Sequence, residues 1–231
     1  MYGLLGAAVN AAAVLVGGLV GLLIGKALNK RIGDAVMTGL ALVVIYIGFS
    51  GALKGQNTLV TIISIAIGAV LGTLMHLEDG VKLLGKKIEE QVSKNGEGKI
   101  AKGFVSSSLL FCVGAMAITG PLDSGLTGNH TTQYTKALLD GIGAIVFASS
   151  LGVGVLFSAG FILLYQGSIT LLAVYIKPFL SEVVINEMTC VGSLLIMALG
   201  FNMLGITKIK VMNYVPAVFL PIVLCLIPGL G

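Results

Sequence analysis

Charged residues are scarce in this chain of 231 residues: they make up 10% of it, while 56% is hydrophobic. A soluble domain carries about 25% charged residues, so the sequence lacks the side chains that would cover a water-facing surface. Tryptophan is absent, which excludes the Trp belt found at many membrane interfaces. The 33 glycines are typical of helices that pack closely inside a bilayer. The composition therefore predicts an integral membrane protein.

Cysteines and catalytic motifs are also few. Cys112, Cys190 and Cys225 each lie in an apolar run, and an odd number of cysteines in hydrocarbon does not form a disulfide framework. The hydrophobic runs contain no GxSxG, Walker or HExxH motif and no pair of catalytic carboxylates. We therefore expect no enzyme activity, no metal site and no cofactor. The net charge of +4 comes from short loops and predicts no nucleic-acid partner.

Apolar runs follow one another along the whole chain, and a membrane helix needs about 20 such residues. The run 138–176 is about twice that length, so we predict two helices that turn at Gly152 and Gly154. The fold class is therefore all-α: a polytopic transmembrane helix bundle of about eight spans in a single domain, 1–231. Seven spans is the alternative, if 138–176 crosses only once. The other predicted spans are 4–25, 33–53, 58–76, 103–119, 183–205 and 211–229.

Lysine and arginine in short loops favour the cytoplasmic side of a membrane. The basic clusters at 26–31, 77–102 and 208–210 fall on one side only if there are eight spans. We therefore predict a multi-pass protein of the bacterial inner membrane with its N-terminus outside. Apolar residues at helical spacing in 77–102 indicate a cytoplasmic amphipathic helix and a linker, either as a plain solvated connection or with a regulatory role.

Three windows of the sequence, 42–53, 108–119 and 194–205, resemble one another. Each has an apolar run, then a glycine (Gly48, Gly114 or Gly200) and then small or polar residues, and the first and third windows share Gly-Phe. With eight spans, the first to third and the sixth to eighth spans would be related with opposite orientation. Such inverted repeats are a frequent plan of transporters, whose binding site lies near the midplane between the halves.

Polar side chains within the spans are the candidate functional residues, because such groups are costly inside a bilayer. Lys136 and Asp140 are four residues apart on one helix and able to pair, and Asp140 would be the ion- or proton-coupling group. The asparagines have an alternative role as hydrogen bonds between helices, worth about 1 kcal/mol each. The predicted solute or ion path is lined by Asn10, Asp140, Ser149, Ser150, Gln166, Asn202 and Asn213.

Small residues recur at every fourth position in two of the spans. Such stripes let another helix approach closely, and that helix can belong to this chain or to a second copy, which would make a homodimer. The predicted packing positions are Ala13, Gly17, Gly21 and Gly25 in the first span and Gly68 and Gly72 in the third.

Several motifs carry a resemblance to a known family. They are the first helix around Asn10, the segments 108–118 and 136–142, Tyr165-Gln166-Gly167, and the terminal segment 208–216. Together they resemble the prokaryotic membrane proteins grouped as domain of unknown function 554, over essentially the whole chain. The resemblance implies a helical membrane protein and names no settled activity.

Two functions fit these observations. The first is a bacterial inner-membrane secondary transporter or channel for a small solute or ion. The second is a membrane component that does not transport, such as an assembly, scaffold or sensory partner. In either case the lipid bilayer is the surrounding medium, and a homo-oligomer is compatible with the small-residue stripes.

Overall fold

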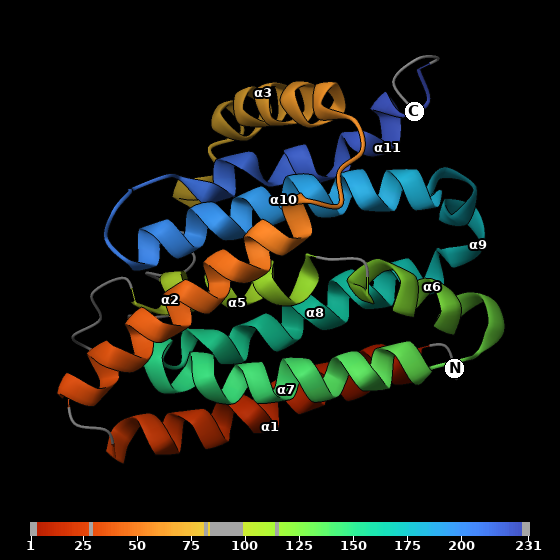
Figure 1. The fold of residues 1–231 in the computed structure, drawn as a ribbon. Coiled ribbons are helices and arrows are strands. Elements are labelled where there is room, and N and C mark those ends of the chain that lie inside the picture. The colour runs from red at the N-terminus through yellow and green to blue at the C-terminus, as the bar shows by residue number, and fades with distance from the viewer. Residues whose placement is uncertain (1–3, 28–29, 81–82, 84–98, 114–115, 228–231) are drawn as a thin grey trace. The chain divides into compact units, whose positions relative to one another are not determined.

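The computed structural model describes residues 4–27, 30–80, 83, 99–113 and 116–227, and these residues are all-helical, with no strand among them (Figure 1). Most of the predicted amphipathic helix at 77–102 lies outside the described residues. The elements are α1 (Leu5–Ala27), α2 (Lys30–Ala52), α3 (Thr58–Leu74), α5 (Lys99–Cys112), α6 (Met116–Thr127), α7 (Thr131–Leu151), α8 (Gly154–Leu171), α9 (Ala173–Ile176), η2 (Lys177–Phe179), α10 (Glu182–Met203), η3 (Val211–Phe219) and α11 (Pro221–Leu224).

Four of the described helices are long and apolar enough to cross a membrane: α1, α2 from Asp34 onwards, α8 and α10. A fifth candidate is the pair α5 and α6, which is bent by 61° at a short break. The face of α1 that points away from the protein is covered by exposed leucine, valine and isoleucine side chains, which suit contact with lipid. The count of eight spans stays a prediction, because α7 is not among these candidates, and α3 and 211–224 are shorter apolar helices.

The run 138–176 forms two helices, as its length predicts. α7 ends at Leu151, α8 begins at Gly154, and Gly152 between them has a φ of 78°. That left-handed backbone conformation is open to glycine at little cost, so the glycine allows the chain to reverse between the two helices.

Two helices differ from the expectation. The span predicted at 103–119 is divided between α5 and α6, and α6 continues through Pro121 to Thr127. A proline within a membrane helix is tolerated when neighbouring groups satisfy the freed backbone. The last span was expected to be one regular helix, but it consists of the 3-10 helix η3 and the short α11. Pro216 lies within η3 and Pro221 begins α11, and each removes a backbone N–H that a continuous α-helix would use.

The described chain forms two compact units, and each is built from segments far apart in the sequence. Unit 1 contains Met1–Leu40, Lys82–Cys112 and Met116–Ile176. Unit 2 contains Ala41–Val81, Val113–Ala115 and Lys177–Gly231. The single domain over 1–231 stays a prediction.

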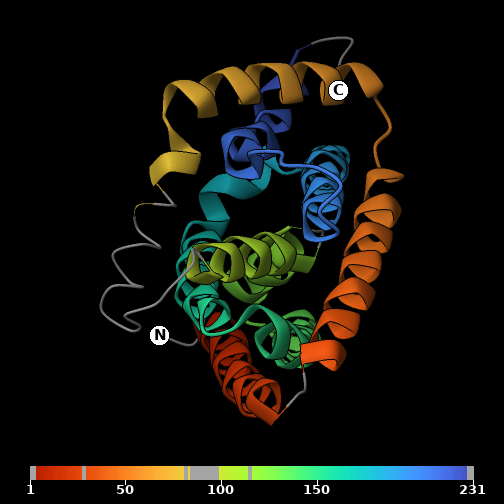
Figure 2. The same cartoon turned by 90° about the vertical axis from the view of Figure 1, so that its left-hand side faces the viewer.

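In unit 1, α1 lies alongside α7 over most of its length (Figures 1 and 2). A side chain added at Gly17, Gly21 or Gly25 of α1 would meet the backbone carbonyls of residues 141, 145 and 149 of α7, respectively. The numbers rise together on the two helices, so α1 and α7 run parallel. The small-residue stripe of the first span thus packs against a helix of the same chain.

α8 also packs on α1, in the opposite direction. Gly18 of α1 faces the side chain of Leu156 near the start of α8, while Leu4 at the other end of α1 faces Gly167. The residue numbers rise on one helix as they fall on the other, so α1 and α8 are antiparallel.

In unit 2, α3 lies beside η3 in both views of the ribbon (Figures 1 and 2). Gly68 of α3 meets Ala217 of η3, and Gly72 meets the backbone of Asn213. These two glycines are the predicted small-residue stripe of the third span. The contacts show that α3 and η3 are antiparallel and that the stripe allows their close approach.

Candidate functional site

The central feature of unit 1 is a buried cluster of four polar side chains contributed by three helices. Asn10 comes from α1, Lys136 and Asp140 from α7, and Gln166 from α8, and at most 6% of each residue is exposed. The parallel packing of α1 on α7, made possible by the glycines, brings Asn10 to Asp140. The antiparallel packing of α8 on α1 brings Gln166 to Asn10.

Lys136 and Asp140 form an ion pair that is shielded from solvent. The Nζ atom of Lys136 lies 2.9 Å from Oδ1 and 2.8 Å from Oδ2 of Asp140. Because the residues are one helical turn apart, the pair forms within α7 and needs no rearrangement of its neighbours. The pair has no net charge, which makes its presence in an apolar bundle less costly than that of either group alone.

Asn10 connects this pair to α8. Its Nδ2 donates to Oδ2 of Asp140 at 3.0 Å and to Oε1 of Gln166 at 3.1 Å. The carboxylate can only accept, so the amide of Asn10 must point its nitrogen at Asp140. Gln166 must then point its oxygen at Asn10. The orientations of both amides are therefore determined by the ion pair.

This arrangement leaves two complementary atoms without a partner. Oδ1 of Asn10 and Nε2 of Gln166 are buried and make no hydrogen bond with any residue that the structure describes. Turning either amide over would set like groups against each other, so no reassignment satisfies them. A buried acceptor and a buried donor beside an ion pair are suited to bind a water molecule or a small polar solute.

A second set of polar side chains surrounds Gln133, which lies one turn before Lys136 on α7. Its other members are Ser124 on α6 and His130 just before α7. The Oγ of Ser124 donates to Oε1 of Gln133 at 2.7 Å and lies 2.8 Å from Nδ1 of His130. Gln133 is fully buried and its Nε2 has no partner. Its side chain lies against Gly6 of α1, where a Cβ would collide with it. The polar face of α7 thus continues beyond the ion pair.

Three residues of the predicted path, Asn10, Asp140 and Gln166, meet in the cluster, and the other four do not. Ser149 donates instead to the carbonyl of Val146 at 2.8 Å, and the buried hydroxyl of Ser150 makes no hydrogen bond.

The two remaining asparagines of the predicted path belong to unit 2 and bind backbone there. Oδ1 of Asn202 accepts from the N–H of Ile209 at 2.9 Å, which ties the end of α10 to the segment before η3. Oδ1 of Asn213 accepts from the N–H of Glu78 at 2.9 Å. These contacts are of the kind expected for the alternative role of hydrogen bonding between elements, and a role in a solute path stays a prediction for both.

Gln133 and Ser124 are not among the residues predicted from the sequence. Positions 133, 136, 140 and 144 recur at helical spacing and share a buried face of α7. This spacing was the signal that could have identified Gln133. Ser124 lies on α6, outside this pattern of positions on α7.

The buried polar cluster, the exposed apolar helix faces and the apolar helices of spanning length define a helical membrane protein. The chain belongs to the family described as protein of unknown function (DUF554), whose model matches residues 5–226. It is 31% identical to the uncharacterized membrane protein YdfK of Bacillus subtilis over 216 residues, covering 92% of this chain and 91% of that protein. It is 29% identical to the uncharacterized protein YqgA of Escherichia coli over 220 residues, covering 94% of each chain. No solved structure matches significantly.

Proposed function

We propose that this protein is a bacterial inner-membrane secondary transporter or channel for a small polar solute or ion. The observation that carries the proposal is the buried cluster of Asn10, Lys136, Asp140 and Gln166, with its unpartnered donor and acceptor. A purely structural hydrogen-bond network would be expected to satisfy its own members. Polar and ionisable groups inside a membrane bundle mark substrate and ion pathways by default.

The directions of the packed helices support a topology of eight spans. α1 and α7 are parallel, as the first and fifth spans would be. α1 and α8 are antiparallel, as are α3 and η3, which agrees with their places as first and sixth, and third and eighth. In a chain of seven spans with one crossing in 138–176, α3 and η3 would be parallel. With eight spans, the basic clusters favour an N-terminus on the outside.

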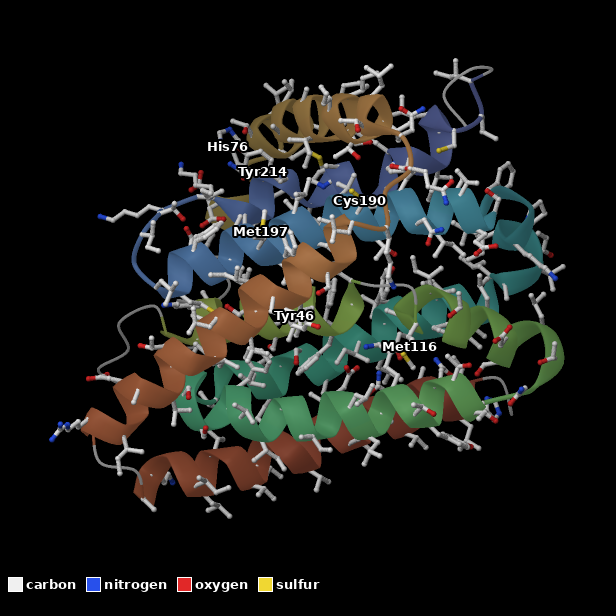
Figure 3. All side chains as sticks on the ribbon, viewed as in Figure 1. Tyr46, His76, Met116, Cys190, Met197 and Tyr214 are labelled. Carbon is white, nitrogen blue, oxygen red and sulfur yellow. The ribbon has the colours of Figure 1, made fainter. Side chains whose placement is uncertain are left out.

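Reciprocal contacts in unit 2 support an inverted repeat. A Cβ on Gly48 would lie 2.6 Å from the N atom of Met197 and 2.8 Å from the O atom of Ser193. A Cβ on Gly200 would lie 3.1 Å from both the N atom of Ile45 and the O atom of Ala41. Figure 3 labels Met197 on α10.

The two sets of contacts are related position by position. Ser193 and Met197 precede Gly200 by seven and three residues, and Ala41 and Ile45 precede Gly48 by the same intervals. Each glycine therefore lies against the counterparts of the residues that lie against the other, as expected if a two-fold axis relates the two segments. The proposed repeat also relates α1 to α8 and α3 to η3. The two helices of each of these pairs pack on each other. Inverted repeats of this kind are common in secondary transporters.

Transport can be tested with the purified protein in liposomes. Solid-supported-membrane currents would be recorded for panels of amino acids, carboxylic acids and alkali cations, and light scattering would follow uncharged polyols. We expect one class to give protein-dependent flux, and we expect Asp140→Asn and Gln166→Met to abolish it. Ser168→Ala is the matched control, because Ser168 is exposed on α8 and bonds only to the carbonyl of Leu164. Unchanged flux in folded Gln166→Met would favour a component that does not transport.

A further inference from the structure

Glu187 is a second buried carboxyl group, in unit 2. It lies in the second turn of α10 and is fully buried. Its Oε1 accepts hydrogen bonds from the backbone N–H groups of Gln56 at 2.6 Å and Asn57 at 2.8 Å. These residues connect α2 to α3, and Asn57 is the N-cap of α3. Since backbone amides only donate, Oε1 remains an acceptor in every protonation state of Glu187.

The other oxygen of Glu187 is unoccupied by any described group. Oε2 is buried and makes no hydrogen bond, and no lysine, arginine or histidine in the described part of the chain forms an ion pair with Glu187. Thr61 of α3 follows this connection closely in the sequence. Its hydroxyl oxygen lies 3.6 Å from the thiol sulfur of Cys190, which is labelled in Figure 3. Described titratable residues on the elements around Glu187 are Tyr46 on α2, Lys54 before α3, Glu182 and Cys190 on α10, Tyr214 on η3 and Cys225 after α11.

Among the described residues two carboxyl groups are buried, and they differ in how far hydrogen bonds and charge compensate them. Both oxygens of Asp140 have hydrogen-bond donors, from Lys136 and from Asn10. Within the described part of the chain, Glu187 has two amide donors on Oε1, no hydrogen-bond partner on Oε2 and no cation paired with it. An ionised carboxylate with one oxygen bare in an apolar interior is costly, and a proton on that oxygen removes the charge.

We propose that Glu187 binds a proton at Oε2 and is the proton-coupling carboxyl group of this protein. A hydronium ion transfers its proton to Oε2: one O–H bond of hydronium breaks and leaves water, one O–H bond forms at Oε2, and the charge of the side chain changes from −1 to 0. A hard metal ion takes about six to eight oxygen ligands, whereas Glu187 itself offers one unpartnered oxygen, Oε2. The described residues also contain no cluster of three metal-ligating side chains. The coupling role rests on the proposed transport function, but the proton site itself does not.

Infrared difference spectroscopy tests the proton site without any solute. The full-length protein in lipid would be titrated between about pH 4 and pH 9 while the C=O stretch of protonated carboxylic acids is recorded. We expect a band that disappears in Glu187→Gln, which keeps the acceptor for Gln56 and Asn57, and that persists in Asp140→Asn and in the exposed control Glu182→Gln. A band that is lost in Asp140→Asn and kept in Glu187→Gln would overturn the proposal.

A second measurement uses only the wild-type protein, in case Glu187→Gln fails to fold. Dicyclohexylcarbodiimide adds to protonated carboxyl groups in apolar surroundings to give an acylurea, which mass spectrometry locates. We expect the adduct on Glu187, formed several-fold faster at acidic than at alkaline pH. The absence of an adduct on Glu187, or protection of Glu187 by Na⁺ at constant pH, would overturn the proton site. Absence of solute flux with both results positive would instead refute only the transport function.

Discussion

The ion pair between Lys136 and Asp140 gives the sharpest test of the buried cluster. With 2.8 Å between Nζ and Oδ2 and an effective dielectric constant of about 20, the Coulomb attraction is about 6 kcal/mol. Most of this attraction is offset by the removal of both charges from water. Removing one partner leaves the other charge buried alone, which costs about 3–5 kcal/mol. We therefore expect Lys136→Met and Asp140→Asn each to lower the free energy of unfolding by about this amount.

The double variant, Lys136→Met with Asp140→Asn, should be more stable than either single variant. It contains no buried charge, and its new amide oxygen can still accept from Asn10. Unfolding would be followed by far-ultraviolet circular dichroism during reversible titration with SDS, because the chain has no tryptophan to serve as a fluorescent probe. Asp123→Asn is the control, since Asp123 is exposed on α6 and its replacement should change stability by less than about 0.5 kcal/mol. If the two single losses simply add in the double variant, the reasoning about the pair is refuted.

Two further predictions concern packing and access. Gly21→Ala should lower stability by about 1–3 kcal/mol, because the added methyl group would collide with the carbonyl of Ile145; Gly160→Ala on α8, which has open space, should have no such cost in the same SDS titration. Cys225 is half-buried and Cys112 is buried, so a small methanethiosulfonate should modify Cys225 first, as measured by mass spectrometry on the folded protein. Equal rates at the two thiols would contradict the packing around Cys112.

The sequence predicts the long helices well, because each is an apolar run of bilayer length. The run 183–205 corresponds to α10 (Glu182–Met203), and the turn at Gly152 follows from the excessive length of 138–176. The sequence predicts helix boundaries less well where a polar residue could lie either in a loop or in a buried helix contact. The residues 122–135 look like a loop, but Ser124 and Gln133 are buried between α6 and α7, and only a short connection remains.

The sequence predicts several residues of the candidate site, but it does not predict how they are arranged. Asn10 and Gln166 are candidates because amides are rare in membrane helices, but their meeting depends on how α1 packs on α7 and α8, which no local pattern specifies. The sequence does not single out Glu187 for the predicted path, because it lies near the start of the predicted span 183–205, where water could reach it. The connection before α3 covers it instead, a long-range contact that sequence spacing cannot reveal.

The interleaving of the two units has a consequence for biosynthesis. During translation α1 is made first, yet α7, against which its glycine face packs, follows only after more than half of the chain. The glycine faces of α1 and α3 must therefore remain in lipid until their partners are inserted. Small-residue faces promote helix association in membranes, so ribosome-bound or truncated chains lacking α7 and η3 carry two surfaces suited to pairing with the wrong helix. Correct assembly of this protein thus depends on its C-terminal half arriving before such encounters occur.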